Sequence, residues 1–252
     1  MRGTYRGAYD RGEALNAAAA SSRQYLSLTF SLLAASLGCL LMIVLRWLVT
    51  GSVLYSFLLW NLFLAWIPYA LSLVILRIRA VHRPSAWREA AAAGTGLAWL
   101  FFYPNAPYIL TDFIHVIEVR VRLPPERSQS LITESAVLWY DIILNSAFAF
   151  VGHIVGLISL NIVHHTIRER VSARLAWGFV ATATILSGYG IYLGRFVRFN
   201  SWDIFRDPAA TLSVALVNLL NPKAVLFSLA FAFLIFLTYV IVWSFHETAR
   251  RQ

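Results

Sequence analysis

The side chains best suited to chemistry gather in three short stretches of an otherwise apolar chain. The first stretch, residues 102–115, places Asp112 and His115 three positions apart, so that a helix presents both on one face. A carboxylate and an imidazole at this spacing could act as a general acid–base pair. They could also supply two ligands to a metal ion, with Asp141 or Asp203 as a third. Two residues at helical spacing are a weak metal pattern, so we predict no metal site and keep an ion-paired carboxylate beside a hydrogen-bonded histidine as the simpler alternative.

The second stretch begins an apolar run with Asp141. In a helix, Asp141 shares a face with Asn145 and with the glycine pair Gly152 and Gly156. Glycines at this spacing let a second helix approach closely. We therefore predict that Asp141 and Asn145 face the interior of the protein rather than lipid.

The third stretch, residues 189–203, contains a second close-approach pair, Gly190 and Gly194, and two arginines one turn apart. Arg195 and Arg198 could clamp a phosphate or a carboxylate, because guanidinium groups bind such anions in a bidentate manner. The favoured alternative is that they pair internally with Asp112, Asp141 or Asp203. The two interpretations are compatible if a substrate lies beside such pairs.

The first stretch is also predicted to break its helix. Pro104 and Pro107 remove backbone donors, and Asn105 is placed to cap the short helix that follows. The polar face of that helix could line a cavity at the membrane surface. The catalytic candidates are Asp112, His115 and Asp141, and the substrate-binding candidates are Asn105, Tyr108, Tyr192, Arg195, Arg198, Asn200 and Asp203.

Composition places these residues in a membrane protein. Of the 252 residues, 59% are hydrophobic and 13% are charged, whereas a soluble domain carries about 25% charged residues. The net charge of +9 does not indicate nucleic-acid binding, because the arginines are dispersed between apolar runs as membrane topology requires. The single cysteine, Cys39, lies in such a run and is interpreted as packing.

The apolar runs predict an all-α, polytopic transmembrane helix bundle of about six spans, with short interfacial helices on the outer side. A span needs about 20 apolar residues. Five runs meet this length, and a sixth is interrupted by Pro104 and Pro107; residues 208–220 are too short to span. The six predicted spans are 26–48, 53–76, 87–110, 137–163, 175–196 and 224–245.

The distribution of lysine and arginine predicts both termini in the cytoplasm. The predicted organisation is a polar cytoplasmic tail over residues 1–24, one transmembrane domain over residues 25–246 and a short cytoplasmic tail over residues 247–252. Asp207 followed by Pro208 predicts the start of a short helix. His164 and His165, next to Arg168 and Arg170, are interpreted as a solvated helix end, and Asn61 as a polar contact between helices.

Three long motifs identify a resemblance. They are Tyr103–His115 (YPNAPYILTDFIH), Trp139-Tyr140-Asp141 and Tyr189–Asp203 (YGIYLGRFVRFNSWD). With them the chain resembles the bacterial membrane family called domain of unknown function 1361, over roughly residues 30–245. The resemblance implies a multi-pass protein of the bacterial inner membrane. It carries over no activity, cofactor or catalytic residue.

Three functional hypotheses remain open, and the sequence does not decide whether the protein is an enzyme. The first is an outer-face site that binds or processes an amphiphilic or lipid-linked anionic substrate, with membrane lipids and such a small molecule as partners. The second is a transporter or channel component, and the third is a structural partner in a membrane complex. The chain has no Gly-rich phosphate loop, nucleophile elbow or H-E-x-x-H motif. No oligomeric state is indicated.

Overall fold

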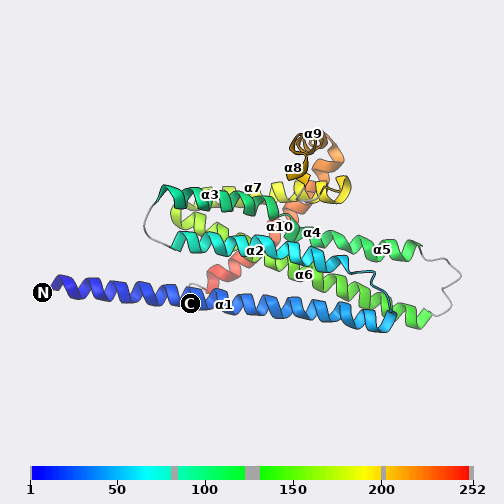
Figure 1. Ribbon diagram of the computed structural model, residues 1–252, viewed down its shortest axis with the longest axis horizontal. Coiled ribbons are helices and arrows are strands. Elements are labelled where there is room, and N and C mark those ends of the chain that lie inside the picture. The colour runs from blue at the N-terminus through cyan, green and yellow to red at the C-terminus, as the bar shows by residue number, and fades with distance from the viewer. Residues whose placement is uncertain (1, 81–84, 123–130, 200–202, 250–252) are drawn as a thin grey trace.

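The computed structural model describes residues 2–80, 85–122, 131–199 and 203–249, with side chains described for residues 25–80, 85–117, 136–199, 203 and 206–249. Within these ranges every regular element is a helix, which confirms the predicted all-α bundle. The long helices are α1 (Arg2–Thr50), α2 (Phe57–Ala80), α3 (Ala86–Phe102), α6 (Leu131–Arg170), α7 (Ala173–Tyr192) and α10 (Pro222–Ala249). They run alongside one another in Figure 1 except for α10, which crosses the others obliquely.

Five helical stretches in the described part of the chain are long and apolar enough to cross a membrane. They coincide with five of the six predicted spans, because each is an uninterrupted apolar run that satisfies its backbone hydrogen bonds internally. The five are Tyr25–Thr50, Phe57–Ala80, Ala136–Arg170, Ala173–Val197 and Pro222–Ala249.

The remaining predicted span, residues 87–110, is the third along the chain and is divided into several helices. Helix α3 has only 17 residues and ends at Phe102. The chain continues through α4 (Asn105–Tyr108), the 3₁₀ turn η1 (Ile109–Asp112) and α5 (Phe113–Arg122), so that α3 and α5 follow one another along the bundle in Figure 1. Pro104 and Pro107 cause the division, because neither residue can donate a backbone hydrogen bond.

Helix α6 lies at the centre of the bundle. It contacts α1, α2, α7 and α10, and it also contacts the α4–α5 segment. Aromatic side chains fill the interior between these helices, with Trp99 stacked on Tyr103 at a centroid distance of 4.6 Å. Large apolar side chains such as Phe233 and Leu226 on α10 are exposed. Such an outer surface is typical of helices that face lipid.

The predicted short helix after the fifth span is present. Helix α9 (Pro208–Asn218) begins at Asp207, whose carboxylate accepts a hydrogen bond from the backbone N–H of Ala210 at 3.0 Å. Proline occupies the first turn, as the sequence predicted. Together with α8 (Asp203–Arg206), α9 follows the end of α7 and lies to one side of the parallel helices (Figure 1).

The interpretation of His164 and His165 as a solvated end is wrong. Both side chains are buried. His164 hydrogen-bonds Tyr239 at 2.5 Å and packs edge-on against Trp177. The aromatic side chains of α7 and α10 therefore cover this part of α6, although arginines follow it in the sequence.

Candidate functional site

A pocket of about 310 Å³ lies between α9 and the helices beside it. Its walls come from α2, the division between α3 and α4, the end of α7 and α9, and they include Trp60, Asn61, Tyr108, Gly194 and Leu212. Most of the wall is apolar or aromatic. Its volume is at the lower end of the range for small-molecule sites.

Glycines on two helices hold the divided segment against the pocket. A Cβ atom on Gly156 would lie 2.7 Å from the Cβ of Ala106, and one on Gly190 would lie 2.9 Å from Pro104. Gly152 contacts Ile109 and Gly194 contacts Tyr108 in the same way. Both predicted glycine pairs therefore do bring another segment close, and that segment is the one that carries Asp112.

Asp112 is the buried centre of a polar cluster formed by three parts of the chain, and the other members of the cluster are half-buried. Its carboxylate accepts a hydrogen bond of 2.7 Å from the amide of Asn61 on α2. Arg195 lies 3.8 Å from its other oxygen and 3.3 Å from the Nε2 atom of His115. Because arginine has no acceptor, Nε2 of His115 accepts this bond, which requires a neutral imidazole with its proton on Nδ1.

The environment of Asp112 changes its protonation. Asp112 is the last residue of η1 and lies outside the five spans, but only 2% of its surface is exposed. Desolvation by burial raises the pKa of Asp112 to about 6, against the opposing effects of the Asn61 hydrogen bond and the Arg195 charge. Asp112 can therefore exchange a proton near neutral pH, which is what acid–base chemistry requires.

The short helical turn before Arg198 directs Arg195 toward Asp112. Residues Leu193–Val197 form a π-helical turn, η3, which ends at Arg198 in a left-handed conformation with φ of 62°. Insertions of this kind occur often at functional sites. Arg198 itself is exposed. Arg195 therefore pairs internally, as the favoured prediction had it.

The remaining predicted site residues have different positions. Asn105 does not cap a helix; its amide donates to the carbonyl of Phe102 at 2.9 Å and so binds the end of α3. Tyr192 donates to Asn218 at 3.2 Å, which ties α7 to the end of α9. Asp203 is the first residue of α8. Asn200 lies outside the described residues.

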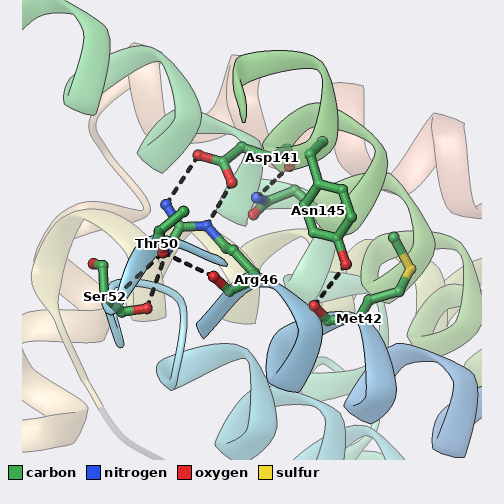
Figure 2. A network of polar contacts seen from close by, with 7 residues as sticks. Met42, Arg46, Thr50, Ser52, Asp141 and Asn145 are labelled. Atoms are coloured by element: carbon green, nitrogen blue, oxygen red, sulfur yellow. Dashed lines mark hydrogen bonds and ion pairs between the residues drawn. The ribbon is translucent and has the colours of Figure 1, made fainter. Parts of the chain in front are cut away.

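Asp141 belongs to a second polar centre, shown in Figure 2. Arg46 on α1 binds its carboxylate in a bidentate manner, with N–O distances of 2.6 Å and 3.2 Å. Both side chains are buried, and Arg46 also lies 4.7 Å from the centre of the Tyr55 ring. Asn145 donates to the backbone carbonyl of Asp141 and is buried with it, as the glycine-pair argument predicted. The charge of Asp141 is thus balanced by Arg46 between α1 and α6, and Asp141 is not a member of the Asp112 cluster.

Two residues of these centres were not predicted as site residues. Arg46 lies inside the predicted span 26–48 and was not among the candidates, and Asn61 was expected only as a polar contact between helices. The missed signal was an ionisable or amide group within an apolar run, because such a group needs a partner in the protein. Among the described residues, no three His, Cys, Asp or Glu side chains come together in an arrangement that could hold a metal ion.

The fold and the buried polar cluster between its helices define the class: this is a polytopic α-helical membrane protein. Residues 60–238 match the family described as "Protein of unknown function (DUF1361)", and the chain belongs to that family. The match confirms the resemblance seen in the motifs. None of the curated proteins or solved structures compared with the chain matches it.

Proposed function

We propose that the protein binds or processes an amphiphilic, lipid-linked anionic molecule in the pocket beside Asp112, at the outer face of a bacterial inner membrane. The observation that carries this proposal is the pairing of an apolar-walled pocket with the adjacent Asp112–Arg195–His115 cluster, whose carboxylate is buried. Ionisable groups at such a place are costly unless they serve a function or pair with one another. Here Arg195 and Asp112 pair, at a nitrogen–oxygen distance of 3.8 Å.

Helix α9 supports entry of the ligand from the bilayer. It has 11 residues, too few to span, and contributes Leu212 and Ala215 to the pocket wall. Its other apolar side chains, including Leu216 and Val217, are exposed. A short helix with exposed apolar side chains is suited to lie in the membrane interface. An acyl or prenyl chain could therefore pass from lipid to the pocket along α9.

Two arginines support an anionic head group. Arg195 and Arg198 lie within the segment whose residues Gly194 and Phe199 line the pocket. The ion pair between Arg195 and Asp112, at 3.8 Å, is longer than a charge-assisted hydrogen bond. A phosphate near Arg195 would thus compete with a weakly held carboxylate.

Binding of a prenyl phosphate to purified protein in nanodiscs tests the proposal. Replacing Arg195 by glutamine is expected to weaken binding by about tenfold or more, because a hydrogen bond to a charged group contributes about 1.5–3 kcal/mol. The matched control is Arg79→Gln, which removes an arginine paired with Glu89 at the C-terminal end of α2. Equal affinity of the wild type and Arg195→Gln would contradict the proposal.

The pKa of Asp112 predicts a pH dependence. Below about pH 6 the carboxyl is protonated and no longer offsets the charge of Arg195, so anion affinity should rise as the pH falls through this value. An alkyl sulfonate is the suitable probe, because its own charge stays constant over this range. Asp112→Asn should bind it tightly at all pH values. If Asp112→Asn keeps the pH dependence while His115→Gln abolishes it, the titrating group is the histidine and the prediction is wrong.

The proposed orientation, with both termini in the cytoplasm, has its own test. Exposed Ser52 precedes α2 near the α5 end, and exposed Val171 separates α6 from α7 at the opposite end. After replacement of the buried Cys39, a cysteine at Ser52 should react with an impermeant thiol reagent in intact cells, whereas one at Val171 should not. The reverse pattern would place the pocket on the cytoplasmic side.

A transporter is the second candidate, favoured by one observation. The segment after the second span is divided into α3, α4, η1 and α5, and discontinuous helices form the binding sites of many transporters. In this case, protein in liposomes should move an amphiphilic anion across the bilayer, and Arg195→Gln should abolish the flux. Binding without flux would leave the first proposal and exclude transport of that probe.

A further inference from the structure

We infer that the head group held in the pocket carries hydroxyl groups on a ring, so that the ligand is a lipid-linked phosphosugar. This inference rests on the proposed function and narrows its substrate class. It comes from a difference in charge between the lining of the pocket and the residues behind that lining. Among the described residues that line the pocket none is charged, although Asp112 and Arg195 lie directly behind the wall formed by Asn61 and Gly194.

Three polar side chains of the pocket each direct one donor into the protein. Asn61 donates through its amide nitrogen to Asp112 at 2.7 Å, and Asn105 donates to the carbonyl of Phe102 at 2.9 Å. The hydroxyl of Thr211 donates to the carbonyl of Asp207 at 2.7 Å. These bonds leave the amide oxygen of Asn61 and the hydroxyl oxygen of Thr211 as acceptors for a ligand, while the second amide N–H of Asn61 and the hydroxyl of Tyr108 can still donate.

A phosphate alone matches only the donors of this lining and leaves its acceptor oxygens without a partner. Ionised phosphate oxygens only accept hydrogen bonds, and acceptors that face one another without a donor lose free energy when water is excluded. Hydroxyl groups donate, so a polyhydroxyl head group would satisfy the oxygens of Asn61 and Thr211. A site built this way discriminates strongly against an analogue that lacks the hydroxyl group.

The aromatic wall favours a ring over a flexible head group. Trp60, Phe101, Tyr108 and Phe199 line the pocket. A sugar ring has an apolar C–H face as well as hydroxyl groups at its edge, and aromatic side chains combine apolar area with polar tips in the same way. The phosphate of such a ligand would lie beside Arg195 and Arg198, in the segment between the lining residues Gly194 and Phe199.

Three lipids with one common prenyl chain test the inference in nanodiscs. They are the prenyl phosphate, the prenyl phosphoglycerol and the prenyl phosphohexose. The hexose lipid should bind at least about tenfold more tightly than the other two, which corresponds to about 1.4 kcal/mol. Trp60→Ala and Asn61→Leu should each reduce this preference. The matched control is Trp47→Ala, because Trp47 is about as exposed as Trp60 (49% and 54%) and lies outside the pocket lining, on α1.

Each outcome decides a separate point. Equal binding of the phosphate and the hexose lipid overturns the inference and leaves the proposed function intact. Equal binding of the glycerol and hexose lipids would show that the site requires hydroxyl groups but not a ring, and this part of the inference would be wrong. If none of the three lipids binds, the proposed function itself fails. Because Asn61→Leu also removes a partner of Asp112, the result for Trp60→Ala decides if the Asn61 variant does not fold.

Discussion

Replacing Asp141 by alanine is expected to destabilise the protein by about 3–5 kcal/mol, because the change leaves the buried guanidinium of Arg46 without its partner. Both residues are less than 10% exposed, and the bidentate pair joins α1 to α6 (Figure 2). Because α1 packs mainly against α6, we expect the first span to separate from the bundle. Thermal unfolding in detergent, followed by loss of monodisperse protein, measures the effect.

Two controls separate a buried charge from a general loss of contacts. The double variant Arg46→Met with Asp141→Leu removes both charges and should recover most of the lost stability. The pair between Arg79 and Glu89 is partly exposed, so Glu89→Ala should change stability by less than about 1 kcal/mol. A double variant that is less stable than Asp141→Ala alone would contradict this account of the pair.

Replacing Gly188 by alanine should have a comparable effect through packing. A Cβ atom at this position would overlap the backbone carbonyl of Ser228, where α7 and α10 are in close contact. Backbone cannot rotate aside as a side chain does, so we expect a loss of about 3 kcal/mol or more, at or above the usual range of about 1–3 for over-packing. The same unfolding measurement applies.

Gly178 on the same helix is the matched control. A Cβ atom there meets nothing within 4 Å. Gly178→Ala should therefore leave stability unchanged or raise it by up to about 1 kcal/mol, since alanine favours a helix more than glycine does. Similar losses for both glycine variants would show that the contact at Gly188 is not the cause.

Much of the fold could be predicted because membrane spans have a simple physical signature. Five uninterrupted apolar runs became five long helices, and Asp207 with Pro208 marked the start of α9. The third segment was less predictable, since prolines show where a helix breaks but not how the chain continues. Burial of His164 could not be read from its charged neighbours, because the rings that cover it come from α7 and α10.

The site was predictable in its residue types and less so in its pairs. Asp112, Asp141 and Asp203 were all open as partners of Arg195, and the structure brings Arg195 to Asp112 and His115. Which carboxylate each arginine binds depends on helix rotation and on depth in the bundle, which periodicity does not determine. In the structure Arg46 pairs with Asp141, and Asn61 donates a hydrogen bond to Asp112, which lies 51 positions away in the sequence.

Photo-cross-linking tests the central claim most directly. A prenyl phosphate with a photoreactive group near its head would be added to the protein in nanodiscs, and the labelled peptides would be identified by mass spectrometry. The account predicts that labels concentrate on the pocket residues of α2 and α9, near Trp60 and Leu212, and disappear with excess unlabelled lipid. Labels spread along the lipid-facing sides of α1 and α10, without competition, would contradict it.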